Sequence, residues 1–399
     1  MEEFKQIEWL FPTTIDYAMW RNQRADVPFS EEVIVYLNAL SASLLRDPQS
    51  RQYPDVVTFA FFCRRANILH LKEAYQSSVL RLGRGMVFHI APSNVPINFA
   101  YSLVAGLLAG NHNVVRVSSK SFVQVDILLR HMAALQSDYP ELSNRIALVR
   151  YEHDSNANAI FSADCHVRVI WGGNRTIQLI RQNALPARSF DICFADRYSL
   201  AVLNADRLVN ETDMDGLAQR FYNDTYLFDQ NACSAPHLVV WLGENGNVIA
   251  AKEAFWSAVQ RLVDKRYPLQ DIQAVDKLTA LYRQAVAMDI QDEPMVNNRL
   301  RRVELKELVS EIDDYRCASG YFSEYTAQSI DDIVPIIKNK YQTMAYYGLE
   351  IDTLRLFVER NRICGIDRIV PIGETTVFSL TWDGYDLIEM MSRIVNINY

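Results

Sequence analysis

The sequence predicts an α/β protein in which a domain of the parallel-sheet, nucleotide-binding type is followed by a second α/β domain. From Gly85 onward, short apolar segments of strand length alternate with segments of helix length, which is the pattern of parallel sheets. The 399 residues suffice for about two or three domains with sizeable cores. Hydrophobic residues make up 49% and charged residues 22%, values that are typical of globular proteins and exclude a disordered chain.

The N-terminal 80 residues are predicted to be helical. Ser30 is a suitable N-cap, Glu31 and Glu32 form an acidic first turn, and the helix should end by Pro48. A second helix is expected over residues 55–75, with an apolar run that belongs to the core or to an interface.

Strands and helices then alternate up to a strand near residue 203. The expected strand at 86–91 is short and apolar, the expected helix at 98–109 is rich in small residues, and that at 122–135 is amphipathic. The predicted strands are 86–91, 113–117, 146–149, 166–171 and 199–203, and the predicted helices are 98–109, 122–135 and 175–183.

A second domain is predicted from residue 209. Residues 1–208 should hold the N-terminal helices and a dinucleotide-binding domain, residues 209–399 a catalytic domain, and the cleft between them the active site. Within 209–399 we expect helices at 213–226, 253–263, 272–288 and 331–340, and strands at 237–241, 363–370 and 376–380.

Composition narrows the possible functions. The formal charge of −8 gives no indication of nucleic-acid binding. The longest apolar stretch, residues 100–110, is far shorter than the roughly 20 residues that span a bilayer, and the acidic start of the chain does not resemble a signal peptide. The six cysteines form no C-x-x-C pair and the histidines no H-x-x-x-H pair, so we expect a reduced, cytoplasmic protein without a metal site.

Two short segments supply groups for acyl chemistry. Cys233 lies in a polar turn before an apolar strand, and a cysteine thiolate is a strong nucleophile. Asn94 lies between a predicted strand and helix, where its carboxamide N–H could stabilise a developing oxyanion. Alternatively, Cys233 is a buried packing residue and Asn94 a turn or helix-capping residue.

Four further residues are candidates for binding an anionic cofactor. Gly172 and Gly173 come directly after a predicted strand and before a helix, where backbone N–H groups can approach a phosphate. Arg116 and Lys120 follow the second strand of the alternating region and could clamp a ribose phosphate. Alternatively, the two glycines form a strand–helix turn that binds no ligand, and the two cations are solvated surface charges.

Three histidines raise the question of a catalytic thiol–imidazole pair. His237 is four residues from Cys233, but a residue at that distance on an emerging strand need not face the thiol. His89 and His112 are much further away along the chain.

Taken together, these segments resemble the LuxC-like acyl-CoA reductase family, typified by the fatty-acyl reductase of bacterial bioluminescence, within the aldehyde dehydrogenase superfamily. The resemblance runs from about Gly83 to the C-terminus. It is strongest in Gly85-Met-Val-Phe-His-Ile-Ala-Pro-Ser-Asn-Val-Pro, Leu108-Ala-Gly-Asn-His-Asn-Val-Val-Arg-Val-Ser-Ser-Lys, Asp229-Gln-Asn-Ala-Cys-Ser-Ala-Pro, Gly365-Ile-Asp-Arg-Ile-Val-Pro-Ile-Gly and Trp382-Asp-Gly-Tyr-Asp-Leu-Ile.

The resemblance implies an aldehyde-dehydrogenase-like fold and a role for each matched position. Cys233 matches the nucleophile, and Asn94 the asparagine of the P-W-N-x-P oxyanion loop, with Ser93 in place of tryptophan. Gly172 and Gly173 match the G-S-T turn that precedes the pyrophosphate-binding helix. The segment from Arg116 to Lys120 matches the K-P-S-E cofactor segment, and the absence of a carboxylate at Ser119 favours NADPH, because a carboxylate would repel the 2′-phosphate.

One departure from the superfamily bears on the reaction. The glutamate that activates water in aldehyde oxidisers has no counterpart, and residues 194–199 occupy its region, with Asp196 as a conceivable substitute. Loss of that base fits an acyl reductase, in which the acyl-enzyme must be reduced and not hydrolysed.

The resemblance therefore implies an NADPH-dependent reductase that converts acyl-CoA or another acyl thioester into an aldehyde. Three alternatives stay open: delivery of the acyl group by a partner acyl-protein synthetase, reduction of an acyl phosphate, and a non-catalytic scaffold subunit. A homo-oligomer is also compatible with the sequence.

Overall fold

The computed structural model describes residues 6–75, 79–92, 95–152 and 155–397. The chain forms two compact units, of which unit 1 comprises residues 1–195 and 378–399 and unit 2 residues 196–377. The division differs from the expected boundary at 208/209 in two respects. Residues 196–208 belong with the second unit, and the C-terminal 378–399 return to the first. The predicted location of the active site between two domains stays a prediction.

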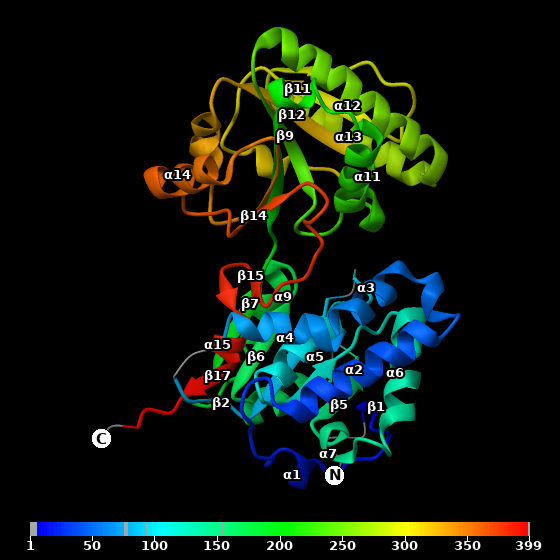
Figure 1. Cartoon of the computed structure of the whole chain (residues 1–399), viewed down its shortest axis with the longest axis vertical. Helices are drawn as coiled ribbons and strands as arrows, with labels where there is room; N and C mark the ends of the chain where they lie inside the picture. Colours follow the sequence, from blue (N-terminus) through cyan, green and yellow to red (C-terminus); the bar gives the residue numbers. More distant parts are fainter. Residues whose placement is uncertain (1–5, 76–78, 93–94, 153–154, 398–399) are drawn as a thin grey trace. The chain divides into compact units, whose positions relative to one another are not determined.

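Unit 1 is built on a six-stranded sheet (Figure 1). Its strands stand in the order β1 (Glu8–Phe11), β5 (Ile146–Arg150), β4 (His112–Arg116), β3 (Met86–Ile90), β6 (Val167–Trp171) and β7 (Phe190–Phe194). All neighbours are parallel except β1, which runs antiparallel to β5. Counted from β3, the parallel strands have the spatial order third, second, first, fourth and fifth, which is that of dinucleotide-binding folds.

Helices cover both faces of this sheet, and its central strands are therefore buried on both sides. Every residue of β3, β4 and β6 is buried. Val87 of β3 belongs to the core on one face, whereas Phe88 belongs to the core on the other. The first face is covered by α2 (Glu31–Arg46), α3 (Pro54–Phe62), α4 (Arg65–Glu73), α5 (Asn98–Leu108) and α6 (Val123–Leu135), and the second by α1 (Tyr17–Trp20), α8 (Ala157–Asp164) and α9 (Asn174–Arg181).

The N-terminal part differs from the sequence expectation in two ways. The single helix expected over residues 55–75 is two helices, because Arg64 takes an extended ψ of 139° and the Asn67 side chain donates to the Phe62 carbonyl oxygen at 2.7 Å. The region is also not wholly helical, since β1 adds a strand to the sheet edge. The remaining elements of unit 1 are α7 (Pro140–Ser143), the strand pair β2 (Arg81–Gly83) and β17 (Ser392–Ile394), β15 (Thr381–Trp382), β16 (Tyr385–Asp386) and α15 (Leu387–Met391).

Unit 2 contains a seven-stranded sheet in which β9 is central. The order is β10 (Ile290–Asp292), β11 (Arg301–Leu305), β12 (Tyr321–Ala327), β9 (Pro236–Leu242), β8 (Tyr198–Asn204), β13 (Tyr341–Tyr347) and β14 (Arg368–Pro371). Only the β10–β11 pair is antiparallel among these pairings. All seven residues of β9 are buried, so the chain just before β9 is attached to a rigid centre.

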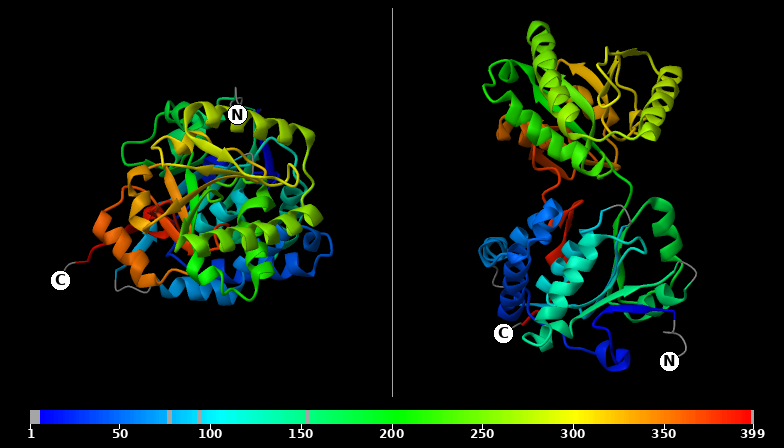
Figure 2. Two further views of the ribbon diagram at one scale, coloured as in Figure 1. Left: turned by 90° about the horizontal axis from the view of Figure 1, so that it is seen from above. Right: turned by 90° about the vertical axis from the view of Figure 1, so that its right-hand side faces the viewer.

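Two layers of helices enclose the sheet of unit 2 (Figure 2). One core cluster joins the sheet to α10 (Ala205–Leu208), α11 (Met214–Thr225) and α12 (Asn245–Arg266). Another joins it to α14 (Ile351–Asn361) and the 3₁₀ segment η5 (Ile330–Ile336). Helix α13 (Asp271–Ala287) packs through Leu281 against β11 and β12.

The second half of unit 2 was the least predictable part. The helix expected at 331–340 is the short η5, which contains Pro335, and the α-helix lies later, as α14. Residues 376–380 form no strand. In the described part of the chain, no helix combines the length and the apolar character that crossing a membrane requires.

Candidate active site

Cys233 lies in an exposed turn between the 3₁₀ segment η3 (Tyr226–Phe228) and β9. The turn is closed by the backbone N–H of Ala235, which donates to the carbonyl oxygen of Ala232 at 2.9 Å. Upstream, Asp229 and Gln230 both have positive φ, 51° and 60°, a conformation that costs energy for residues other than glycine. Cys233 is therefore not a packing cysteine, and its turn is held in an unusual backbone path by the surrounding structure.

Gln230 is the residue that fixes this path. Its side chain is buried, and its amide Nε2 donates to the carbonyl oxygens of Pro236, at 2.9 Å, and Tyr321, at 3.0 Å. Its Oε1 accepts from the backbone N–H groups of Gly320, at 2.9 Å, and Tyr321, at 3.2 Å. The carboxamide thus forms four hydrogen bonds that connect the cysteine turn to the starts of β9 and β12.

Asp229 adds a second attachment. Its Oδ1 accepts from the hydroxyl of Tyr267 at 2.5 Å, and its carbonyl oxygen accepts from the backbone N–H of Ser319 at 3.0 Å. The Ser319 carbonyl oxygen in turn accepts from the buried ammonium of Lys277 at 2.6 Å. Burial lowers the pKa of Lys277 to about 8.

Ser199 of β8 holds the carbonyl group of the cysteine itself. Its buried hydroxyl donates to the Cys233 carbonyl oxygen at 2.7 Å and accepts from the backbone N–H of Thr343 at 3.2 Å. Neither Gln230 nor Ser199 was singled out from the sequence. The only signal was a glutamine three residues before a cysteine, next to an apolar strand.

Two further groups that could take part in catalysis, His237 and Asp196, are held by hydrogen bonds. His237 donates from Nδ1 to the Cys317 carbonyl oxygen at 3.1 Å, and burial lowers its pKa to about 3, so the ring is neutral at pH 7. Asp196, the conceivable substitute for a water-activating glutamate, accepts from Arg316 Nη2 at 2.5 Å.

The cofactor candidates come together at one edge of the sheet of unit 1. Arg116 ends β4, Gly172 and Gly173 follow β6, and Ile90 at the end of β3 pairs with Arg116 on one side and Ile170 on the other. Connections leave β3 and β6 toward opposite faces, so this edge is the topological switch point where open α/β sheets bind ligands.

The residues at this edge fit a dinucleotide. Gly173 is the N-cap of α9, so no side chain satisfies the first N–H groups of the helix, and a Cβ at Gly173 would meet no atom within 4 Å. Ser119 and Lys120 are exposed, and Lys120 forms no ion pair with any residue the structure describes. Arg116 is buried, with its guanidinium carbon 4.9 Å from the ring centroid of Tyr151, and its Nε has no hydrogen-bond partner among the described residues.

His89 and His112 have structural roles. His89 is wholly buried and bonds Ser102 Oγ at 2.7 Å through Nδ1 and Asn113 Oδ1 at 3.0 Å through Nε2. Trp171 Nε1 donates to the same Ser102 oxygen at 3.0 Å. His112 bonds the Arg21 carbonyl oxygen at 3.2 Å. Burial lowers the pKa of both imidazoles to about 4, so neither carries a charge at neutral pH.

Asn94 lies outside the described residues. Among the residues that are described, no group of three or more histidine, cysteine or acidic side chains is arranged to hold a metal ion. The structure thus describes the fold and the turn that carries Cys233. The proposal that Asn94 stabilises the oxyanion still rests on the sequence alone.

Comparison with known proteins identifies relatives of this chain. The family model described as acyl-CoA reductase (LuxC) matches residues 64–394. The long-chain acyl-protein thioester reductase of Vibrio harveyi is 22% identical over 320 residues, which cover 78% of this chain and 63% of that protein. The long-chain acyl-protein thioester reductase of Aliivibrio fischeri is 21% identical over 326 residues, which cover 78% of this chain and 64% of that protein. The chain thus spans less than two thirds of the length of these relatives.

Solved structures with the same fold are aldehyde dehydrogenases. Aldehyde dehydrogenase 21 of Physcomitrella patens superposes with a TM-score of 0.64 at 12% identity, covering 92% of this chain and 84% of that one. An NAD-dependent benzaldehyde dehydrogenase of Corynebacterium glutamicum has a TM-score of 0.59 at 16% identity, covering 94% and 86% of the two chains. The predicted aldehyde-dehydrogenase-like fold is confirmed.

Proposed function

Because this chain belongs to the LuxC acyl-CoA reductase family, we propose that it reduces an acyl thioester to an aldehyde through an acyl-enzyme at Cys233. The observation that carries the proposal is the exposed thiol on a turn that the buried Gln230 carboxamide fixes to two strands. Such positioning places a nucleophile at low entropic cost, which is a large part of what an acyl-transfer enzyme supplies.

The first half-reaction is transfer of the acyl group to the protein. The Cys233 thiolate attacks the thioester carbon, and the carbonyl oxygen becomes negative in the tetrahedral intermediate. Asn94 and the backbone N–H of Cys233 are the proposed donors to that oxyanion. The intermediate collapses as the C–S bond to the leaving thiol breaks, and the leaving thiolate takes up a proton.

The second half-reaction reduces the acyl-cysteine to an aldehyde. A bound nicotinamide supplies the hydride, and we propose NADPH as the cofactor. Gly172, Gly173 and the N-terminus of α9 would bind the pyrophosphate, and Arg116, Ser119 and Lys120 the ribose 2′-phosphate. Addition of the hydride to the acyl carbon, with a proton to its oxygen, would give a thiohemiacetal on Cys233. Its C–S bond would then break, which releases the aldehyde and restores the thiol.

The experiment that tests the function is a panel of acyl thioesters, from acetyl to tetradecanoyl, with the loss of NADPH absorbance and aldehyde formation as readouts. Nucleotide-dependent aldehyde formation from at least one thioester is the expected result. Acyl-CoA, acyl phosphate and an acyl group supplied by an acyl-protein synthetase are offered in separate reactions, which distinguishes the three donors. Aldehyde from acyl phosphate alone, or no aldehyde from any donor, would overturn the proposal.

Lys120→Ala is expected to weaken NADPH binding more than NADH binding. The exposed ammonium would contact only the 2′-phosphate, so the KM for NADPH should rise about tenfold while the KM for NADH stays nearly constant. Lys265→Ala, which removes a cation from the last turn of α12, is the matched control. Equal changes in both KM values would mean that Lys120 does not read the 2′-phosphate.

Ser199→Ala is expected to lower kcat about tenfold, because the Cys233 carbonyl oxygen and the Thr343 N–H both lose a buried partner. Ser323→Ala is the control, because Ser323 is a buried serine of the same sheet whose hydroxyl accepts from Gln284 Nε2. Its loss should reduce thermal stability similarly but leave kcat unchanged. If both variants lowered kcat to the same extent, Ser199 would have no positioning role.

A further inference from the structure

Helix α13 carries an apolar stripe that the structure leaves exposed. Ile272, Val275, Leu278, Tyr282 and Val286 are 60%, 57%, 42%, 62% and 91% exposed. Their spacing of three or four residues places them on one face of the helix. An exposed apolar stripe of this length on a soluble domain is typical of an interaction surface.

The opposite face of α13 is fixed to unit 2, so the stripe cannot turn inward. Leu281 packs against Val303 and Tyr321. Gln284 Nε2 donates to Ser323 Oγ at 3.0 Å, and Lys277 donates to the Ser319 carbonyl oxygen at 2.6 Å. These buried contacts determine which side of the helix faces outward.

The exposed charges of α13 are placed so that a second copy of the same helix would complement them. Asp276 and Arg283 are exposed, lie seven residues apart at the same edge of the stripe, and form no ion pair with any residue in the described part of the chain. When two copies of such a helix pack antiparallel, residues at the same edge face each other. With the two-fold axis between Thr279 and Ala280, Asp276 of each copy lies opposite Arg283 of the other.

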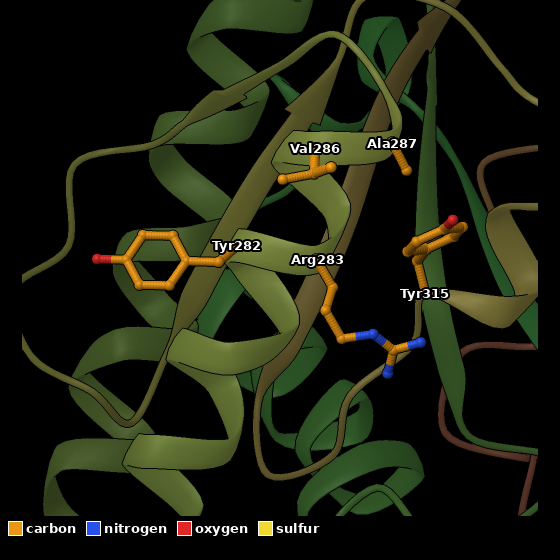
Figure 3. Close-up of a pocket in the computed structure, with 5 residues that line it drawn as sticks. All are labelled: Tyr282, Arg283, Val286, Ala287 and Tyr315. Atoms are coloured by element: carbon orange, nitrogen blue, oxygen red, sulfur yellow. The ribbon is translucent and has the colours of Figure 1, made fainter.

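The surface beside the stripe is hollowed at the C-terminal half of the helix (Figure 3). A hollow of about 400 Å³ is lined by Tyr282, Arg283, Val286, Ala287 and Tyr315. The Arg283 guanidinium lies on the side of Tyr315, while the Tyr282 ring extends from the other side of the helix (Figure 3). A side chain of a facing helix can therefore insert next to Arg283.

We propose that α13 forms a two-fold interface between two copies of this chain, with the two helices antiparallel. The stripe provides apolar burial, and two symmetric Asp276–Arg283 pairs fix the register. In a parallel arrangement the same edges would lie on opposite sides of the interface, so Asp276 of one copy could not pair with Arg283 of the other. The interface is independent of the proposed function, so either can fail without the other.

The test is the oligomeric state, measured by sedimentation velocity from about 1 to 100 µM. The full chain is expected to dimerise in this range, and Tyr282→Asp with Val286→Asp to make it monomeric. Ile249→Asp, a substitution of a 70% exposed residue on α12, is the matched control and should leave the dimer intact. Circular dichroism and the thermal transition check that each variant is folded. A monomeric wild type, or a dimer that survives the double substitution, would overturn the proposal.

Charge reversal distinguishes a second copy in this register from any other partner. Asp276→Arg alone and Arg283→Asp alone should each raise the dimer dissociation constant by about tenfold, since two attractive pairs become repulsive. The double variant restores both pairs with exchanged signs and should return the constant to within about threefold of the wild-type value. A double variant that dimerises no better than the single variants would contradict the antiparallel pairing.

Discussion

Cys233→Ala is expected to abolish NADPH oxidation and aldehyde formation with every acyl donor. Alanine has no group that can attack the thioester carbon, and loss of a catalytic nucleophile costs on the order of 10⁶ in kcat in other enzymes. The fold should be unaffected because the side chain lies in an exposed turn and contributes little to packing. The measurement is the steady-state rate with a saturating thioester, together with the thermal transition.

Cys364→Ala is the control for this experiment, since Cys364 is the other of the six cysteines that is exposed. It should react at the wild-type rate. A Cys233→Ala enzyme that kept a substantial fraction of the wild-type rate would remove Cys233 from the mechanism.

Gln230→Glu is expected to be the most destabilising of the conservative substitutions near the site. It places a carboxylate oxygen where the amide nitrogen now donates to the carbonyl oxygens of Pro236 and Tyr321, in a position closed to solvent. Breaking a buried polar arrangement in this way typically costs about 3–5 kcal/mol. The free energy of unfolding should fall by this amount at pH 8, and kcat should fall with it because the turn loses its attachment.

The loss of stability caused by Gln230→Glu should depend on pH. A glutamate at this buried position would have one oxygen facing the carbonyl oxygens of Pro236 and Tyr321, so its pKa in the folded state is raised and its protonated form is favoured. The destabilisation should therefore be largest above that folded pKa and shrink as the pH falls toward the unfolded value of about 4.3. Gln273→Glu is the control, because its Oε1 accepts from the Gln270 N–H and a carboxylate can do the same. Equal losses for both variants, or no loss at Gln230, would contradict the role of this carboxamide.

The parts of the fold that the sequence predicted are those where apolar residues are continuous. Strands β3, β6 and β9 are apolar over most of their length and bounded by turns, so each could be located within one or two residues. The order of these strands and the intervening helices was enough to predict the parallel sheet.

Strand β12 was not predicted, for a physical reason that only the tertiary structure supplies. Strand β12 contains Glu324, which normally argues against a buried strand. Its carboxylate is wholly buried and accepts from Trp241 Nε1 at 2.7 Å, Trp256 Nε1 at 2.8 Å and Arg302 Nε at 2.6 Å. No local pattern reveals partners 22 to 83 positions away.

The candidate site also contains residues that could be predicted from the local sequence and residues that could not. Cys233 could be proposed from its neighbours in the sequence, and the structure places it in an exposed turn. The role of Gln230 could not, because its function depends on Gly320 and Tyr321, which lie about ninety positions further along. The assignments of Asn94 and of the nucleotide-binding residues stay predictions.

The most direct test is a single turnover followed by intact-protein mass spectrometry. The protein is mixed with an acyl thioester without nucleotide, and NADPH is then added to the isolated product. We expect one acyl group per chain, located on the peptide that contains Cys233, and its loss on NADPH addition with one equivalent each of NADPH oxidised and aldehyde released. Aldehyde formation without any acylated protein, or an acyl group that persists on Cys233 in the presence of NADPH, would contradict the mechanism.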